Sequence, residues 1–145
     1  MALVLLLLAA LCVPAIVVEV TAGGEQPACR VWLRDVSTLT VSYVHSVERT
    51  PVRESYSVSV TGIRLREVRW QSFGYGLPDE YDDFEDGFYV KSEDVGLGRR
   101  LDYWFMPLND ARIAVGAHTV FEGLDEPARV SIRVRLVPLF VAVQG

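Results

Sequence analysis

A period-two alternation of apolar and polar residues runs through most of this chain and limits its fold more than any other feature. The clearest case is residues 130–136, VSIRVRL, where Val, Ile and Leu alternate with Ser and Arg. Residues 39–43 and 52–60 repeat the pattern, and further strands are expected at 63–70, 88–91, 101–106 and 112–121. Such alternation predicts half-buried β-strands, and no window shows the stripe of an amphipathic helix.

Short turn signals separate these segments. They are Thr61-Gly62, Gly96-Leu97-Gly98, Asn109-Asp110 and Glu122-Gly123. About seven or eight short strands without internal repeats predict an all-β fold, a single antiparallel β-sandwich or small barrel. The apolar residues 136–143 are too few to span a bilayer, and an edge strand or a docked terminus is expected there.

The first residues of the chain have a different character. Residues 2–18 form an apolar run that is free of charge until Glu19. This length is at the lower edge of a membrane span and also fits a secretory signal with Val20-Thr21-Ala22 as its cleavage site. We therefore expect residues 1–22 to be a signal peptide or an uncleaved membrane anchor, residues 23–28 a linker and residues 29–145 the β domain. Either alternative exports the domain to the periplasm or the extracellular space.

Cysteine content agrees with export without proving it. Cys12 lies within the apolar run and would leave with a signal peptide, so Cys29 would remain alone. The exported piece could then form no internal disulfide and would depend on its hydrophobic core. At about 120 residues, it is long enough to bury one.

Polar residues interrupt the β pattern at residues 43–54, YVHSVERTPVRE. The parity of residues 39–43 directs His45 inward, and the parity of residues 56–58 directs Glu54 to the same face. A hairpin that paired Val41 with Val58 would set His45 opposite Glu54, and a register shifted by two would keep both on the shared face.

Three interpretations of this pair remain open. His45 and Glu54 form a structural polar clamp, bind a ligand, or take part in catalysis. Ser46 follows His45 directly, so their side chains would point to opposite faces of a strand, which argues against a Ser-His relay. An enzyme would be a small hydrolase or a metal-dependent enzyme that uses His45, Glu48 and Glu54.

A glycine loop, residues 72–78 (SFGYGLP), is the second irregular segment. Its glycines either expose backbone amides as an anion-binding nest or simply turn a corner. A meander of strands would return this loop toward the end of the sheet that carries Glu54. We therefore predict one polar ligand-binding mouth formed by His45, Ser46, Glu48, Glu54, Ser72, Gly74 and Gly76.

The acidic stretch 79–87, DEYDDFEDG, is interpreted as a solvated loop. Asp82, Asp86 and Glu93 match three ligand positions of a calcium loop, but Phe84 stands where an oxygen ligand belongs. No cofactor is predicted. The net charge of −5 and the lack of a basic segment interleaved with aromatic residues exclude nucleic acid as a partner.

YVHSVERTPVRE followed by SFGYGLP resembles the signature of DUF1850, a family of small exported domains of unknown function. The resemblance extends from Cys29 to about Pro138 and includes a later stretch from Val115-Gly116 to Val134. The chain departs from the pattern at Tyr75, between the glycines, and in the acidic insert after Pro78.

The resemblance implies a role beside TRAP transporters of the TAXI type, which take up organic acids with an extracytoplasmic solute-binding protein. We accordingly expect a non-enzymatic accessory or binding domain, with a small organic acid or amino acid as ligand and transporter components as partners. It would be membrane-associated if residues 2–18 stay uncleaved.

Overall fold

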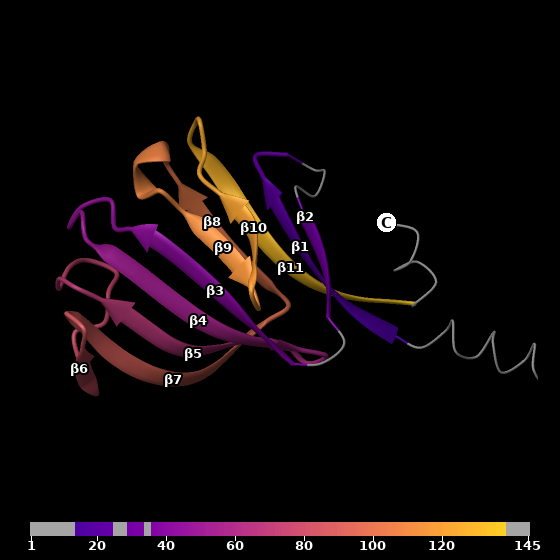
Figure 1. Ribbon diagram of the computed structural model, residues 1–145, viewed down its shortest axis with the longest axis horizontal. Coiled ribbons are helices and arrows are strands. Elements are labelled where there is room, and N and C mark those ends of the chain that lie inside the picture. Colours follow the sequence, from indigo (N-terminus) through magenta and orange to yellow (C-terminus); the bar gives the residue numbers. More distant parts are fainter. Residues whose placement is uncertain (1–13, 25–28, 34–35, 139–145) are drawn as a thin grey trace, which may run out of the picture.

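Two antiparallel sheets face each other in the computed structural model, which describes residues 14–24, 29–33 and 36–138 (Figure 1). One sheet has four strands in the order β2-β1-β11-β8, and the other has seven in the order β10-β9-β3-β4-β5-β7-β6. Within the described residues the only helical element is the short 3-10 helix η1 (Pro107–Asn109). The predicted all-β class is confirmed, and the two open sheets form a sandwich.

The strands follow the predicted alternation closely. Their bounds are β1 (Pro14–Ala22), β2 (Cys29–Leu33), β3 (Ser37–Val44), β4 (Pro51–Ser59), β5 (Gly62–Trp70), β6 (Asp83–Glu85), β7 (Phe88–Gly98), β8 (Arg100–Phe105), β9 (Arg112–Val115), β10 (His118–Glu122) and β11 (Ala128–Pro138). The expected strand at 112–121 is two strands joined by a tight turn, and residues 88–98 form one long strand. The predicted hairpin at Thr61-Gly62 joins β4 to β5.

Strand β1 begins the folded domain well before the predicted boundary at residue 29. It pairs along its whole length with β11 and also with β2, so it lies inside the four-stranded sheet. Val17 and Val18 are at most 2% exposed. A continuous apolar run is typical of a strand covered on both faces as well as of an export segment, and periodicity alone does not separate the two. The predicted division of the chain at residues 22 and 29 stays a prediction; residues 1–13 and Cys12 lie outside the described residues.

The main core fills the space between the sheets. Its buried members come from both layers and include Val18, Val130 and Ile132 from the smaller sheet and Leu39, Val41 and Ile113 from the larger one. A second cluster, Val52, Val68 and Trp70, packs under Leu77 of the glycine loop. That loop therefore covers the end of the larger sheet where the polar mouth was predicted.

The register of β3 and β4 differs from the proposed hairpin. Val41 pairs with Glu54 and Tyr43 pairs with Val52, which is a shift of four residues along β4. An even shift keeps every side chain on its predicted face, because side chains alternate with period two. Glu54 therefore faces the interior as predicted, but His45 lies beyond the pairing and is not opposite it.

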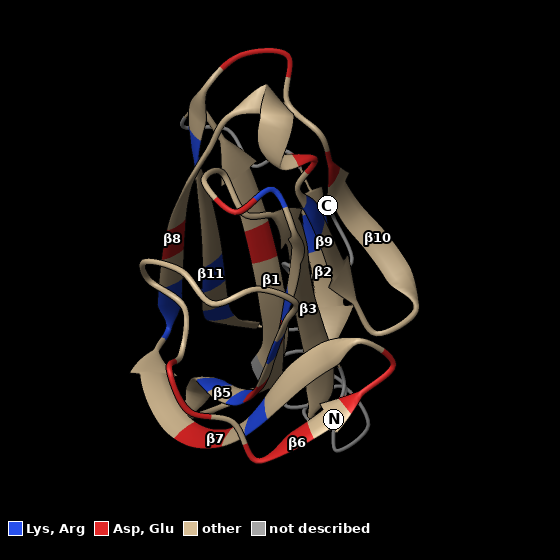
Figure 2. Cartoon of the chain, turned by 90° about the vertical axis from the view of Figure 1, so that its left-hand side faces the viewer, with Lys and Arg blue, Asp and Glu red and all other residues tan. Residues whose placement is uncertain are grey.

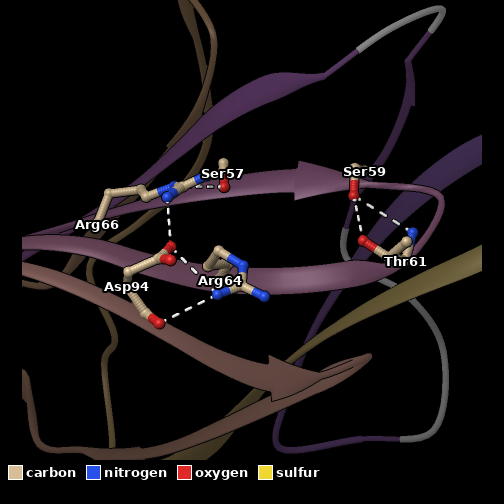
Figure 3. A network of polar contacts seen from close by, with 6 residues as sticks. All are labelled: Ser57, Ser59, Thr61, Arg64, Arg66 and Asp94. Carbon is tan, nitrogen blue, oxygen red and sulfur yellow. Dashed lines mark hydrogen bonds and ion pairs between the residues drawn. The ribbon is translucent and has the colours of Figure 1, made fainter.

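The outer face of the larger sheet carries a polar network on β4, β5 and β7 (Figure 3). Arg64 and Arg66 both form ion pairs with Asp94, and Arg66 also donates to the Ser57 hydroxyl. Pairs exposed to this extent contribute little to stability. Both guanidinium groups of this network nevertheless have a carboxylate partner.

Two further observations concern membrane-spanning helices and free cysteines. No helix in the described part of the chain is long and apolar enough to cross a membrane. Cys29 is a free cysteine.

Candidate functional site

Glu54 lies between the two sheets and accepts hydrogen bonds from three tyrosine hydroxyls. Tyr56 and Tyr103 reach its Oε2 at 2.7 and 2.5 Å, and Tyr43 reaches Oε1 at 3.3 Å. The Tyr56 and Tyr103 hydroxyls are also 2.5 Å apart. Because Tyr103 belongs to β8 while the other residues belong to β3 and β4, this tyrosine–glutamate cluster joins the two sheets by polar contacts.

The three tyrosines remain hydrogen-bond donors over a wide pH range. Burial, followed by the nearby Glu54 carboxylate, raises the pKa of Tyr43, Tyr56 and Tyr103 well above the ordinary value of 10.0. A tyrosine that cannot ionise supplies a neutral O–H together with a large apolar ring. The cluster thus provides hydrogen-bond donors to a carboxylate inside the sandwich without placing a cation there.

His45 occupies the turn between β3 and β4, where backbone hydrogen bonds fix it. Its amide donates to the Thr50 carbonyl, and its carbonyl accepts from the Arg49 amide. The ring Nδ1 accepts a hydrogen bond from the Glu48 amide at 3.2 Å. When the ring is neutral, its proton therefore lies on Nε2, so His45 can offer a donor to a ligand through that atom.

The glycine loop packs against this turn. A Cβ atom built on Gly74 would lie 2.5 Å from both Cγ and Oε1 of Glu48, so only glycine fits there without displacing the glutamate. The Leu77 amide donates to the Gly74 carbonyl, and Gly76 between them has a φ of 83°, a conformation that glycine adopts readily. The loop thus turns a corner, as one of the two interpretations predicted.

A cavity of about 290 Å³ opens where the end of β3 meets β8 and η1. It is lined by Tyr43, His45, Ser46, Tyr103, Trp104, Phe105, Met106 and Asn109. Asn109 is buried, accepts from the Met106 amide and donates to the Val44 carbonyl at 2.8 Å, which fixes η1 against the end of β3. We call this cavity the mouth.

The structure brings only part of the predicted set together. His45 and Ser46 line the mouth. The Glu48 amide donates a hydrogen bond to His45, and Gly74 lies against the Glu48 side chain. Glu54 connects to the mouth only through Tyr43 and Tyr103, which contact both. Ser72 and Gly76 lie in the same loop as Gly74 but are not among the residues that line the mouth. Whether any of these residues binds a ligand stays a prediction.

The three residues proposed for an enzyme have different hydrogen-bond partners in the structure. His45 uses Nδ1 to accept a backbone hydrogen bond, and Glu54 accepts from tyrosines alone. The His45–Glu54 clamp is likewise not formed in this register.

The calcium candidates are separated by the fold. Asp86 and Gly87, with φ values of 51° and 82°, form the two-residue turn that joins β6 to β7. The Asp82 carboxylate accepts a hydrogen bond from the Ser92 amide at 2.7 Å. Among the described residues, no group of three or more His, Cys, Asp or Glu side chains is placed to hold a metal ion.

Sequence reasoning missed the tyrosines as partners of Glu54. Tyr43 and Tyr56 had been assigned to the interior by parity, and Tyr103 follows the same rule within residues 101–105. An inward-facing glutamate surrounded by inward-facing tyrosines was a usable signal. What was absent from the sequence was the packing of β8 over β4.

Comparisons with known proteins add one finding. No curated protein and no solved structure matches the chain. Residues 39–121, more than half of the chain, match the family described as Domain of unknown function (DUF1850). This match spans the His45 turn, the glycine loop, the tyrosines of the cluster and η1. The chain therefore belongs to the DUF1850 family.

Proposed function

We propose that this protein is an exported, non-enzymatic binding module that serves a solute transporter of the TRAP type. The observation that carries the proposal is the mouth, a cavity between the sheets that is lined by polar groups from a rigid frame. Binding sites are typically preformed concave regions with a few convergent polar groups.

The mouth suits a small polar ligand, an organic acid or an amino acid. Its volume of about 290 Å³ is at the small end of ligand cavities. His45 Nε2 and the Ser46 hydroxyl supply donors for a carboxylate or a hydroxyl group. The aromatic residues Tyr103 and Phe105 supply apolar walls.

Rigidity supports binding at this place. The ring of Tyr103 stacks on Phe105 with centroids 5.1 Å apart, and Phe105 is 3% exposed. The hydroxyl of Tyr103 is fixed by Glu54, and Asn109 fixes η1. Walls that are already ordered lose little conformational entropy when a ligand enters.

The enzymatic alternative has less support. A hydrolase or metal enzyme built on His45, Glu48 and Glu54 needs these groups to act on one substrate atom. Glu54 accepts hydrogen bonds from tyrosines, while the Glu48 side chain packs on Gly74.

Export and the link to a transporter rest on the apolar N-terminal run and on the family resemblance. A cut after Ala22 would remove β1 from the sheet, so the fold as described requires that residues 14–22 are retained. A reporter fused after Gly145 tests export; activity only of a reporter that requires the cytoplasm would contradict it.

Native mass spectrometry of the purified protein against a panel of dicarboxylates and amino acids, with and without calcium, tests the binding role. We expect one ligand to be retained, and His45→Ala to weaken its binding about tenfold or more because a donor is lost. The matched control is His118→Ala, which changes the other, exposed histidine on β10.

Two results would contradict the proposal. One is that no member of the panel is retained by the wild-type protein. The other is that His45→Ala and His118→Ala bind the ligand equally well while both remain folded.

A further inference from the structure

The outer face of the four-stranded sheet collects arginines that are far apart in the sequence. They are Arg30 on β2, Arg100 on β8, and Arg129, Arg133 and Arg135 on β11. We call this surface the arginine face, and Figure 2 shows its blue bands on β8 and β11. A chain with a net charge of −5 thus presents a surface of opposite sign.

The carboxylates of this face are already engaged. Glu19 is 8% exposed and pairs with Arg30 at 3.2 Å and with Arg135 at 3.4 Å. Asp102 pairs with Arg100 at 2.8 Å and with Arg129 at 2.9 Å. Four of the five guanidinium groups therefore share two carboxylates on this face.

Arg133 is left without a carboxylate. It forms no ion pair with the residues that the structure describes, although Glu19 is its register partner on β1. Its register partner on the other side, on β8, is Arg100. Like charges directly opposite each other on neighbouring strands are destabilising. An anion between Arg133 and Arg100 would relieve this repulsion.

A cavity lies at this position. Its volume is about 500 Å³, and its lining includes Arg100, Arg129, Arg133, Ser131, Thr21 and Trp104. The Trp104 side chain is 67% exposed and stands beside the arginines as an apolar surface. Glu126 at the rim is the one acidic residue among the lining residues.

We propose that this cavity is a binding site for a small anion that carries carboxylate or phosphate groups. Arg133 and Arg100 are its charged contacts, and Trp104 is its apolar wall. Guanidinium groups bind both kinds of anion through paired N–H donors, which gives geometric selectivity as well as charge. The Ser131 and Thr21 hydroxyls on neighbouring strands complete the floor of the site.

This site is separate from the mouth. Trp104 contacts both cavities, but none of the arginines lines the mouth, and neither His45 nor Ser46 lines the arginine cavity. A ligand of one cavity therefore depends on side chains that the other does not use. The two proposals can fail independently.

Isothermal titration of the full chain with succinate and, separately, with inorganic phosphate tests the proposal at constant ionic strength set by chloride. We expect saturable binding of at least one anion. Arg133→Met keeps most of the aliphatic stem and should weaken that binding about tenfold or more. Arg133→Lys keeps the charge but loses the paired N–H donors of the guanidinium group. Its affinity for the anion should therefore lie between those of the wild type and Arg133→Met.

The matched control is Arg64→Met, which removes one positive charge from the outer face of the other sheet and should change affinity less than about twofold. Arg133 is exposed and has no ion pair to lose, so its variants should melt at the wild-type temperature.

Tighter binding of succinate would identify carboxylates as the ligand class, and tighter binding of phosphate would identify phosphates. The proposal is overturned if neither anion binds the wild-type protein at up to about 10 mM, well above the affinities of specific sites. It is also overturned if Arg64→Met and Arg133→Met weaken binding equally, since that would show only a diffuse effect of charge.

Discussion

Glu54 and Asp102 show two ways in which this sandwich accommodates a carboxylate. Glu54 lies between the sheets and is held by three neutral tyrosine hydroxyls. Asp102 lies on the outer face of the smaller sheet, where Arg100, Arg129 and the Ser131 hydroxyl hold it. Both sites meet on β8, because Tyr103 points inward directly after Asp102 points outward.

The difference follows from the cost of burying charge. An arginine placed between the sheets would have to lose its hydration, and the ion pair would not fully offset that cost. Tyrosine avoids the problem, since its ring fills the core and its hydroxyl satisfies the carboxylate. On the outer face water still hydrates the guanidinium groups, so charged partners are tolerated there.

The largest expected effect comes from removing β1, which supports both sites. A chain that begins at Gly23 loses Ile16, Val17, Val18 and Val20, all buried, and loses Glu19 from the arginine face. Their burial contributes about 6–12 kcal/mol, which is comparable to the whole stability of a typical domain. We expect this chain to lack a cooperative thermal transition.

The control is a chain that begins at Pro14, which should retain the transition. Circular dichroism and calorimetry of the two chains give the comparison. If the shorter chain melts like the longer one, β1 is dispensable and a cleavage after Ala22 is compatible with the fold.

The second effect distinguishes the two carboxylates. Glu54→Ala leaves three tyrosine hydroxyls between the sheets without their acceptor, and we expect the free energy of unfolding to fall by about 2–4 kcal/mol. Asp102→Ala is the matched substitution on the outer face of the smaller sheet. It should lower the free energy of unfolding by less than about 1 kcal/mol, because water can hydrate the arginines that lose their partner. Urea denaturation measures both, and equal losses would refute the distinction.

The sequence predicted the strands and their faces well, because period-two alternation records which side chains are buried. It placed Glu54, Tyr43 and Tyr56 on the inner face correctly. It could not give the register of β3 and β4, since any even shift keeps the same faces. The register in which His45 would lie opposite Glu54 is therefore not the one that the strands adopt.

Features built from contiguous residues were easier to predict than features assembled across strands. The contact between the His45 turn and the glycine loop was expected from the meander, and Gly74 does touch Glu48. The arginine face was missed, because its members are spread from Arg30 to Arg135 and become neighbours only through pairing. The sequence contains no basic segment interleaved with aromatic residues, yet the sheet assembles arginines around Trp104.

The third prediction concerns alkaline pH. The pKa of Tyr103 is raised above its ordinary value of 10.0 in the folded protein, first by burial and then by Glu54. The folded state thus binds this proton more tightly, so its contribution to stability is complete below about pH 10 and decreases as the pH rises further.

Tyr103→Phe should therefore lower the free energy of unfolding by about 1–2 kcal/mol at neutral pH, since one hydrogen bond to a carboxylate is lost. The difference in the free energy of unfolding between wild type and variant should narrow above about pH 10, because only the wild type loses the contribution of Tyr103. Urea denaturation from pH 7 to 11 tests this. A gap that stays constant over that range would contradict the role assigned to the buried hydroxyl.

The smallest effect concerns Asp102 and appears at the acidic end. The Ser131 hydroxyl and then Arg100 hold the pKa of Asp102 well below its ordinary value of 3.8. A lowered pKa in the folded state means that the unfolded chain takes up the proton first as the pH falls. The contribution of Asp102 to stability is therefore complete above about pH 4 and is lost progressively at lower pH.

Asp102→Asn keeps the shape of the side chain but removes the charge. Its deficit in the free energy of unfolding against wild type should stay constant from pH 5 to 8 and shrink below pH 4. Because the site is solvated, the deficit should remain below about 1 kcal/mol. Glu19→Gln provides the companion measurement on the same face. A deficit for Asp102→Asn that grows as the pH falls would show that the arginines do not stabilise the ionised carboxylate.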